Sequence, residues 1–409
     1  MPRVAILSTG NELVCGRTTD TNAAFLSERL FAAGFRVVMH MAVGDSVDDI
    51  DFALGECESR ADIVILTGGL GPTDDDHTLA AMRKHYNLGE LIDEQGKGRM
   101  ESFFSSMGRT PMPGDLKMVT VPENALVFEN DRGLALGYAV VRDKKTIIAM
   151  PGVPTEMEYM FEHRVMPYLC RISPAGRRES VEIRVAMMRE AEVNLLVKGM
   201  KIPLDTMDWG ITTRPGLNTV VFVAREGADF PAQGILEEAK NVFGHSLLRQ
   251  GARGIEEEVE ALLSERDMTI AVAESCTGGL VAKCLTDIPG SSRVFLGGVV
   301  AYDNEAKKKL LSVPDAELSA HGAVSEEVAL SMALGARRRF GSSIAISTTG
   351  IAGPGGGSEK KPVGTVCFGL AFPDRNETET RSMAGDRARV RMFAAQYAMD
   401  RVRLYLRGG

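Results

Sequence analysis

The chain has 409 residues, and this length predicts two or three domains rather than a single hydrophobic core. Hydrophobic residues make up 44% and charged residues 25% of the composition, as in an ordinary globular protein. The formal net charge of -8 argues against a protein that holds nucleic acid by neutralising phosphates. It does not argue against a small anionic substrate, which needs only a local binding site.

The cysteines and the N-terminus indicate the compartment. The six cysteines are scattered without a Cys-x-x-Cys pair, which favours reduced thiols over a disulfide framework or a zinc site. Residues 1–8 enter a strand pattern directly, and the sequence contains no apolar run of about 18 residues. We therefore expect a cytoplasmic protein that does not contact a membrane.

The first region, residues 1–172, alternates strands with helices. Strands are predicted at 4–7, 35–41 and 62–67 from short apolar runs. Asp20 or Thr21 caps a first helix, and Ser46 caps a second through a pattern that resembles a capping box. This alternation predicts an α/β domain with a doubly wound parallel sheet.

Polar loops follow the strands at 4–7 and 62–67 and a further predicted strand at 146–150, at the edge where doubly wound sheets bind ligands. The loops span residues 10–12, 67–76 and 151–156, and their glycines let backbone N–H groups approach a phosphate closely. The aspartates at 74–76 would repel that phosphate unless a divalent cation such as Mg²⁺ or Mn²⁺ lay between them. The alternative is that these aspartates only cap the helix that begins near Thr78.

Segments 10–13, 20–22, 67–78 and 151–156 resemble the molybdopterin-binding (MoaB/MogA-like) domain of the CinA family. The resemblance implies a metal-dependent ADP-ribose pyrophosphatase that releases AMP and ribose 5-phosphate, with Mg, Mn or Co as the metal. It also implies which residues bind the metal and the diphosphate: Glu12, Gly68, Gly69, Gly71, Asp75, Asp76 and Glu156. His77 departs from the pattern, because the family usually has an apolar residue there.

The middle region, residues 173–251, begins with a loop at 173–180 that marks the domain boundary by its composition. Strands at 181–187 and 219–225 and helices at 190–200 and 231–243 predict a small α+β module, which resembles the KH-like connector of the CinA family. Because no Gly-x-x-Gly loop joins the predicted helix to the next strand, we expect a structural connector without bound nucleic acid. Trp209 is expected to pack in the interior rather than to stack on a base.

The third region, residues 252–409, contains two glycine-rich loops after predicted strands. Residues 274–279 read Glu-Ser-Cys-Thr-Gly-Gly and turn a strand into a helix, a geometry that favours anion binding, although a plain turn is the alternative. The second loop, 350–358, contains five glycines, and ordering it is entropically costly. Such a loop is typical of backbone that meets a ligand.

A helix predicted from residue 304 onward carries three consecutive lysines. At 100° per residue, Lys307 falls inside the apolar arc, whereas Lys308 and Lys309 fall outside it. A partly buried lysine has a lowered pKa and can act as a base near neutral pH. The alternative is that Lys307 extends along the helix to the surface.

Residues 273–391 resemble the nicotinamide-nucleotide amidase (PncC-type) domain of the CinA family. The motifs that carry the resemblance are 273–279, 290–292, 302–307, 321–325, 350–353 and 361–365. The resemblance implies an α/β domain that deamidates nicotinamide mononucleotide without a metal, using Ser292 as nucleophile with Tyr302 and Lys307. Which of Tyr302 and Lys307 takes the proton first is left open. The expected substrate-binding residues are Glu274, Ser275, Thr277, Gly278, Gly279, Gly350, Gly353, Gly355 and Arg387.

The sequence thus predicts an enzyme with two nucleotide sites, one for ADP-ribose at 1–172 and one for nicotinamide mononucleotide at 252–409. One alternative is that the first domain only binds a molybdopterin-like ligand or a nucleotide. Another is a non-enzymatic factor in competence or DNA damage, which the acidic chain without a basic tract disfavours. The resemblance also implies a homodimer.

Overall fold

The computed structural model describes residues 2–173, 179–225 and 227–408. The chain divides into two compact units, Met1–Arg178 and Glu179–Gly409. Most of the boundary loop predicted at 173–180 lies outside the described residues. The division into domains at 172 and 251 stays a prediction. Within the described ranges, no helix is long and apolar enough to span a membrane.

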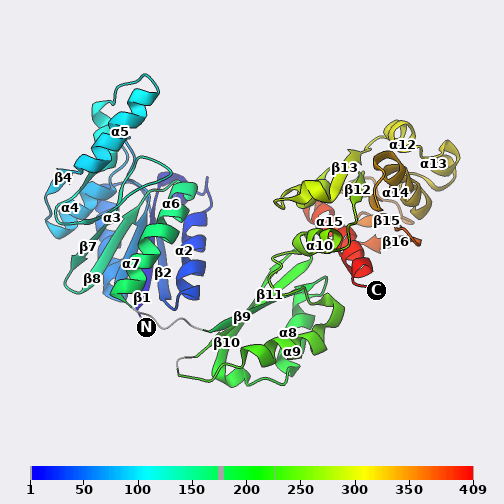
Figure 1. The fold of residues 1–409 in the computed structure, drawn as a ribbon, viewed down its shortest axis with the longest axis horizontal. Helices are drawn as coiled ribbons and strands as arrows, with labels where there is room; N and C mark the ends of the chain where they lie inside the picture. The colour runs from blue at the N-terminus through cyan, green and yellow to red at the C-terminus, as the bar shows by residue number, and fades with distance from the viewer. Residues whose placement is uncertain (1, 174–178, 226, 409) are drawn as a thin grey trace. The chain divides into compact units, whose positions relative to one another are not determined.

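The first unit is built on a mixed sheet (Figure 1). Its strands, in sheet order, are β2 (Arg36–Val43), β1 (Arg3–Thr9), β3 (Ile63–Thr67), β8 (Lys145–Met150), β7 (Gly137–Arg142) and β6 (Leu126–Phe128). The strands from β2 to β8 run parallel, and β7 and β6 continue the sheet in antiparallel fashion. The doubly wound α/β fold is confirmed, and the predicted parallel sheet gains an antiparallel edge.

Two helical layers cover this sheet. The helices are α1 (Asn11–Val14), α2 (Thr21–Ala32), α3 (Val47–Arg60), α4 (Thr78–Tyr86), α5 (Glu94–Ser106), α6 (Pro154–Met160) and α7 (Met166–Ile172). Shorter elements are β4 (Glu90–Ile92), β5 (Thr120–Pro122), η1 (Pro113–Val119) and η2 (Phe161–Val165). Side chains alternate along each strand, so Val4 and Ile6 pack with α2 and α6, while Ala5 and Leu7 pack with α3 and α4.

The predicted helix caps are confirmed. Asp20 accepts a hydrogen bond from the backbone N–H of Ala23 at 2.9 Å, and Ser46 accepts one from the N–H of Asp49 at 3.1 Å. Each cap satisfies a donor that the first helical turn leaves without a partner. The caps thereby fix where α2 and α3 begin, just after the polar ends of β1 and β2.

The second unit begins with an antiparallel sheet in the order β10-β11-β9. Its elements are β9 (Ser180–Ala186), α8 (Glu190–Gly199), η3 (Leu204–Thr206), β10 (Met207–Arg214), β11 (Leu217–Ala224), α9 (Ala232–Phe243) and η4 (Gly244–Ser246). Trp209 on β10 packs against Phe222 with ring centroids 6.5 Å apart, as expected for a packing anchor. At Gly216, in the left-handed region at φ 78°, an added Cβ would lie 2.8 Å from the Cβ of Gln396, so this turn packs closely on the C-terminal helix.

The second sheet of this unit has the order β13-β12-β14-β15-β16. Its strands are β12 (Ile270–Glu274), β13 (Phe295–Val300), β14 (Ile344–Gly350), β15 (Thr365–Ala371) and β16 (Asn376–Ser382), and its helices are α10 (Ile255–Glu265), α11 (Leu280–Thr286), η5 (Ser291–Arg293), α12 (Asn304–Leu311), α13 (Asp315–His321), α14 (Glu326–Phe340) and α15 (Arg387–Leu406). β12 pairs in parallel with β13 and β14, so the carboxyl ends of these three strands share one edge. Helices α10, α11 and α15 cover one face, and α12 to α14 cover the other.

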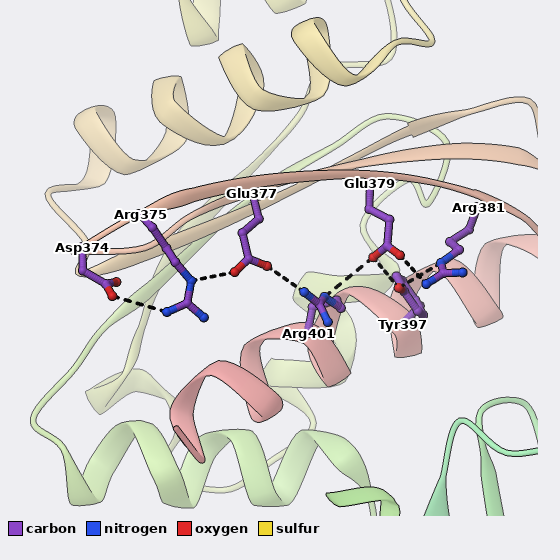
Figure 2. Close-up of polar contacts among 7 residues, drawn as sticks. All are labelled: Asp374, Arg375, Glu377, Glu379, Arg381, Tyr397 and Arg401. Atoms are coloured by element: carbon purple, nitrogen blue, oxygen red, sulfur yellow. Dashed lines mark hydrogen bonds and ion pairs between the residues drawn. The ribbon is translucent and has the colours of Figure 1, made fainter. Parts of the chain in front are cut away.

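A chain of polar contacts joins the edge strand β16 to α15 (Figure 2). Arg401 on α15 donates to Glu377 at 2.6 Å, and Arg375 donates to the same carboxylate at 2.7 Å. Farther along the strand, Glu379 accepts a hydrogen bond from the hydroxyl of Tyr397. These contacts hold the C-terminal half of α15 against the sheet, and the first turns of the same helix carry residues of the candidate site.

Candidate functional site

Lys307 is buried at the carboxyl end of β13. Only 1% of Lys307 is exposed to solvent. By contrast, Lys309 is exposed, and Lys308 forms an ion pair with Asp315 at 3.0 Å. The helical projection of the three lysines is therefore confirmed. Nζ of Lys307 donates to the backbone oxygen of Tyr302 at 3.3 Å. Burial lowers the pKa of Lys307, and the nearby negative groups oppose this shift without reversing it.

Ser275 lies beside this lysine, at the end of the neighbouring strand. Glu274 is paired with Val300 in the register of β12 and β13, and its backbone oxygen accepts from the N–H of Ala301 at 2.8 Å. Ser275 and Tyr302 therefore leave two adjacent parallel strands at the same edge, where strands lie about 4.8 Å apart. Cys276, the next residue, is close enough to affect the charge state of Lys307. The structure thus brings Ser275, Tyr302 and Lys307 to one corner.

Ser292 lies elsewhere. It is exposed in η5 (Ser291–Arg293), which precedes β13, whereas Tyr302 and Lys307 follow that strand. A strand rises about 3.3 Å per residue, so the length of Phe295–Val300 separates the two ends by roughly 17 Å. Within one chain the structure does not bring the predicted nucleophile together with its predicted partners. Among the expected substrate-binding residues, Ser275 is the serine that shares their edge.

The predicted anion site at the start of α11 is filled by the chain itself. The carboxylate of Glu274, a residue 1% exposed, accepts hydrogen bonds from the N–H groups of Gly279 at 2.8 Å, Val281 at 3.1 Å and Ala282 at 2.8 Å. These are the donors that would otherwise meet a phosphate. The expectation that Glu274 and Gly279 bind substrate is corrected: they close the loop, with Gly278 at φ 60° in its turn.

Arg391 of α15 fixes the same loop from the other side. It donates to the backbone oxygen of Cys276 at 3.1 Å and to that of Thr277 at 2.7 Å. Thr277 is fully buried, and its hydroxyl lies 2.6 Å from that of Thr348 on β14. Both the hydroxyl and the backbone oxygen of Thr277 are hydrogen-bonded within the protein. Thr277 therefore has a structural role instead of the predicted contact with substrate. These contacts fix the turn that follows Ser275. No sequence pattern had indicated a role for Arg391.

Arg387 joins the glycine-rich loop to Tyr302. It donates to the backbone oxygen of Gly353 at 2.7 Å and to the hydroxyl of Tyr302 at 2.8 Å. Gly350 is tightly packed, since an added Cβ would lie 2.7 Å from the backbone oxygen of Thr365, whereas Gly355 is exposed with open space around it. Two predicted substrate-binding residues, Arg387 and Gly353, therefore lie together with Tyr302, which was predicted to be catalytic. The backbone oxygen of Tyr302 accepts a hydrogen bond from Lys307, whereas its side-chain hydroxyl accepts one from Arg387. The hydroxyl is therefore not hydrogen-bonded to Lys307, as a proton relay between the two would require.

The polar end of the first sheet gathers acidic side chains. Burial raises the pKa of Asp45, and the negative charges of Glu12, Asp75 and Asp76 raise it further against a hydrogen bond from Asn11. Three of these four were predicted, and Asp45, in the turn after β2, was missed because nothing distinguishes it in the sequence. The backbone oxygen of Asp45 lies 2.8 Å from Nδ1 of His77, which gives that unusual residue a local partner.

The described side chains do not form a ready metal site. Thr73 occupies both aspartates, since its hydroxyl donates to Asp75 and, at 2.6 Å, to Asp76. Glu156 accepts a hydrogen bond from Asn130 at 2.7 Å instead of joining the other predicted carboxylates. Among residues 2–173, 179–225 and 227–408, no three His, Cys, Asp or Glu side chains are grouped to hold one metal ion. The arrangement does not fit a resident ion, and we assign no step to one.

The glycine-rich loop after β3 depends on its glycines. Gly68 and Gly69 lie in the left-handed region at φ 105° and 67°, and an added Cβ on Gly68 would lie 2.5 Å from the backbone oxygen of Thr9. At Gly71 an added Cβ would lie 2.6 Å from Oδ2 of Asp76. The three predicted glycines are thus needed to shape the loop and to place Asp76.

Three buried polar atoms at this edge have no hydrogen-bond partner within the described part of the chain. They are Oγ of Ser8, Oγ1 of Thr9 and Oδ1 of Asn22. Buried polar atoms are normally satisfied, so unpaired ones mark places where a ligand or water completes the bonding. Ser8 and Thr9 lie at the carboxyl end of β1 and Asn22 lies in the first turn of α2, which agrees with the ligand edge of a doubly wound sheet.

The fold and these two edges define an α/β protein with a molybdopterin-binding type of first domain. Comparison with known families agrees, since residues 5–171 match the family described as a probable molybdopterin binding domain and residues 252–406 match the CinA C-terminal domain. A CinA-like protein of Desulfosudis oleivorans is 40% identical over 379 residues, which cover 91% of this chain and 92% of that protein. A putative competence-damage inducible protein of Caldanaerobacter subterraneus is 36% identical over 411 residues, covering 99% of each chain.

The chain therefore belongs to the CinA family. Among solved structures, a competence damage-inducible protein A from Klebsiella pneumoniae is 36% identical, covers 37% of this chain and 95% of that one, and has a TM-score of 0.37.

Proposed function

We propose that the second unit is an amidase that hydrolyses the carboxamide of nicotinamide mononucleotide to nicotinic acid mononucleotide and ammonia. The observation that carries the proposal is the buried Lys307 with a lowered pKa, beside the strand end that presents Ser275. A neutral lysine in this position is a base suited to a serine nucleophile that has no histidine partner. The choice of substrate rests on the resemblance of the motifs in residues 273–391, and the match to the CinA C-terminal domain supports the family alone.

We assign the nucleophile to Ser275 instead of Ser292. Oγ of Ser275 attacks the carboxamide carbon while Nζ of Lys307 takes the hydroxyl proton. The N–H groups of Gly278 and Gly279 already donate to Ser275 and Glu274, so the oxyanion in this scheme takes its hydrogen bonds from other backbone N–H groups. When the C–N bond breaks, the lysine ammonium returns the proton to the leaving amine, and ammonia departs. Water, deprotonated by Lys307, then hydrolyses the acyl ester and releases the carboxylate product.

Arg387 and Tyr302 bind the substrate in this scheme. The guanidinium of Arg387 is planar and positively charged, which suits the phosphate of a mononucleotide. Its link to the hydroxyl of Tyr302 and to the carbonyl of Gly353 orients it at the open side of the corner. Gly355 is exposed with open space around it, so backbone can approach the ligand there, whereas Gly353 is buried against Val363.

The test compares two serine variants of the full chain. Ser275→Ala is expected to lower ammonia release from nicotinamide mononucleotide by at least about 10³-fold, and Ser292→Ala is the matched control that retains activity. The reverse pattern would restore Ser292 as the nucleophile and refute our assignment. If the wild-type chain releases no ammonia from this substrate, the amidase proposal itself fails.

For the first unit we propose a nucleotide diphosphatase that cleaves ADP-ribose to AMP and ribose 5-phosphate. The unpaired polar atoms of Ser8, Thr9 and Asn22 beside the acidic group support a ligand at this edge. Product analysis with and without a chelator and added Mg²⁺, Mn²⁺ or Co²⁺ tests the predicted metal dependence, and Asp75→Asn tests the acidic group. Cleavage that survives both changes would remove the metal prediction, and tight binding without cleavage would leave a binding module.

A further inference from the structure

A basic cavity lies in the second unit, where the module of β9 and α9 meets α10 and the end of α15. Its volume is about 350 Å³, within the range of small-molecule sites. The residues used below to define the basic cavity are Arg184, Leu236, Lys240, Leu248, Arg249 and Arg407. The cavity is separate from the corner of Ser275 and Lys307, since none of those residues lines it.

The charges of the basic cavity are only partly neutralised from within. Arg184 pairs with Glu182 at 2.5 Å, and Arg249 donates to Glu265 at 2.7 Å through one terminal nitrogen, which leaves its other nitrogens available. Among the described residues, Lys240 forms no hydrogen bond or ion pair through its ammonium group. The cavity therefore presents at least one uncompensated positive charge beside the free donors of a second cation.

Arg407 lines the inner wall as an ion-paired cation that lies near two other guanidinium groups. It donates to Glu258 at 2.6 Å and to the backbone oxygen of Leu247 at 2.9 Å. Burial lowers the pKa of Arg407, Glu258 opposes the shift, and the neighbouring guanidinium groups of Arg403 and Arg249 lower it further. An anion in the cavity would relieve this repulsion.

The remaining wall is apolar and includes Leu236, Leu247 and Leu248. A ligand that matched both walls would combine an anionic group with a ring or another flat apolar part. Guanidinium groups favour phosphate because their donors match its oxygens in pairs. We propose that the basic cavity binds a phosphorylated small molecule of mononucleotide size, with its phosphate against Lys240 and Arg249 and its ring on the leucines.

The site joins the connector module to the helix that organises the amidase corner. Lys240 comes from α9, and Arg407 follows α15, whose first turns carry Arg387 and Arg391. α15 has 20 residues and is about 30 Å long at 1.5 Å per residue. A ligand held by both elements would clamp the connector to this helix.

The test uses the full chain. AMP and inorganic phosphate are the probes, and amide hydrogen exchange reports which residues each of them protects. AMP is expected to protect residues 244–252 and to bind at least about tenfold tighter than inorganic phosphate, since the apolar wall adds to the charge contact. Lys240→Glu should abolish this protection and weaken binding at this site at least about tenfold. Lys198→Glu, a change at an exposed lysine on α8 away from the cavity, is the matched control and should change neither.

Three outcomes would overturn the proposal. The first is the absence of protection of 244–252 at millimolar AMP, and the second is equal protection in Lys240→Glu and in wild type. The third is AMP binding no tighter than inorganic phosphate, which would remove the ring from the assignment. Because exchange is followed at 244–252, binding of AMP at the proposed sites of either unit does not count as support. The proposal therefore stands or falls independently of both proposed activities.

Discussion

Replacing Lys307 by methionine should remove activity while leaving the second unit as stable as before or more stable. Lys307 is 1% exposed, and its ammonium group has one neutral acceptor, the backbone oxygen of Tyr302 at 3.3 Å. Below its lowered pKa, the folded protein pays for burying this charge. Replacing buried charged groups by apolar residues of similar volume is often neutral or stabilising by about 1–4 kcal/mol. Removal of a general base costs about 10²–10⁴-fold in rate.

The sign of the pH dependence follows from linkage. The folded-state pKa of Lys307 lies below its ordinary value of 10.5, so between the two values the unfolded chain binds more protons. Wild-type stability should therefore rise with pH across that window, by up to about 1.36 kcal/mol per pH unit, and Lys307→Met should lose this rise. The rate of ammonia release should also rise as Lys307 loses its proton, with a midpoint below 10.5.

Denaturant unfolding followed by Trp209 fluorescence measures the stability, because this single tryptophan lies in the same compact unit as Lys307. Lys307→Arg is the control: it keeps the positive charge, cannot act as a base at neutral pH, and should be both inactive and less stable than Lys307→Met. The reasoning fails if Lys307→Met keeps a tenth of the wild-type activity. It also fails if that variant is less stable than wild type at pH 7.

Three further changes test other parts of the structure. Glu274→Gln should destabilise the second unit by about 1–3 kcal/mol in urea unfolding, because a buried N–H at the start of α11 loses its acceptor; unchanged stability would contradict the cap. Arg401→Met should cost about 1 kcal/mol at low salt and less at 1 M salt. Although burial raises the pKa of Glu377, hydrogen bonds from Arg375 and Arg401 lower it overall, so this contribution is present above about pH 4.5 and is lost as pH falls through the folded pKa. Asp45→Asn should stabilise the first unit by up to about 1 kcal/mol at pH 7, a figure that already allows for solvent screening. In scanning calorimetry this gain should disappear below about pH 3.8, because Asp45 is then protonated in both the folded and the unfolded state.

Local patterns predicted β1, β2 and β3 of the first sheet, β9 and β11 of the β10-β11-β9 sheet and the helix caps, because burial imposes a periodicity that a short window of sequence reveals. The inward direction of Lys307 is such a case, since one helix determines it. β16 was missed for the opposite reason: its residues, Asn-Glu-Thr-Glu-Thr-Arg-Ser, show no apolar alternation. Its inward side chains are held by charges from α15, as Figure 2 shows.

The two ends of β13 show why spacing along the sequence is a poor guide to which serine lies near Lys307. Ser292 and Lys307 are 15 positions apart, in the separate motifs 290–292 and 302–307, and the resemblance implied that they share one site. A strand between them carries the chain about 17 Å in one direction. Ser275 is farther away along the chain, but the parallel pairing of β12 with β13 returns it to the lysine. Pairing register, which single-sequence patterns do not contain, decides which serine the base can reach.

Helix α15 was also hard to interpret from sequence, because charged residues make up part of its buried face. Arg403 is 1% exposed and pairs with Asp400 at 2.7 Å, one turn away, and lies 4.0 Å from Glu258 of α10. The periodicity of apolar residues is therefore weak in a helix that is well packed. Contacts with other segments add to this local pairing, as where Arg403 lies near Glu258 and Arg391 donates to the loop after Ser275. The helix that positions the proposed active site is thus specified by pairs that lie up to 145 residues apart in sequence, which is why only the folded chain reveals its role.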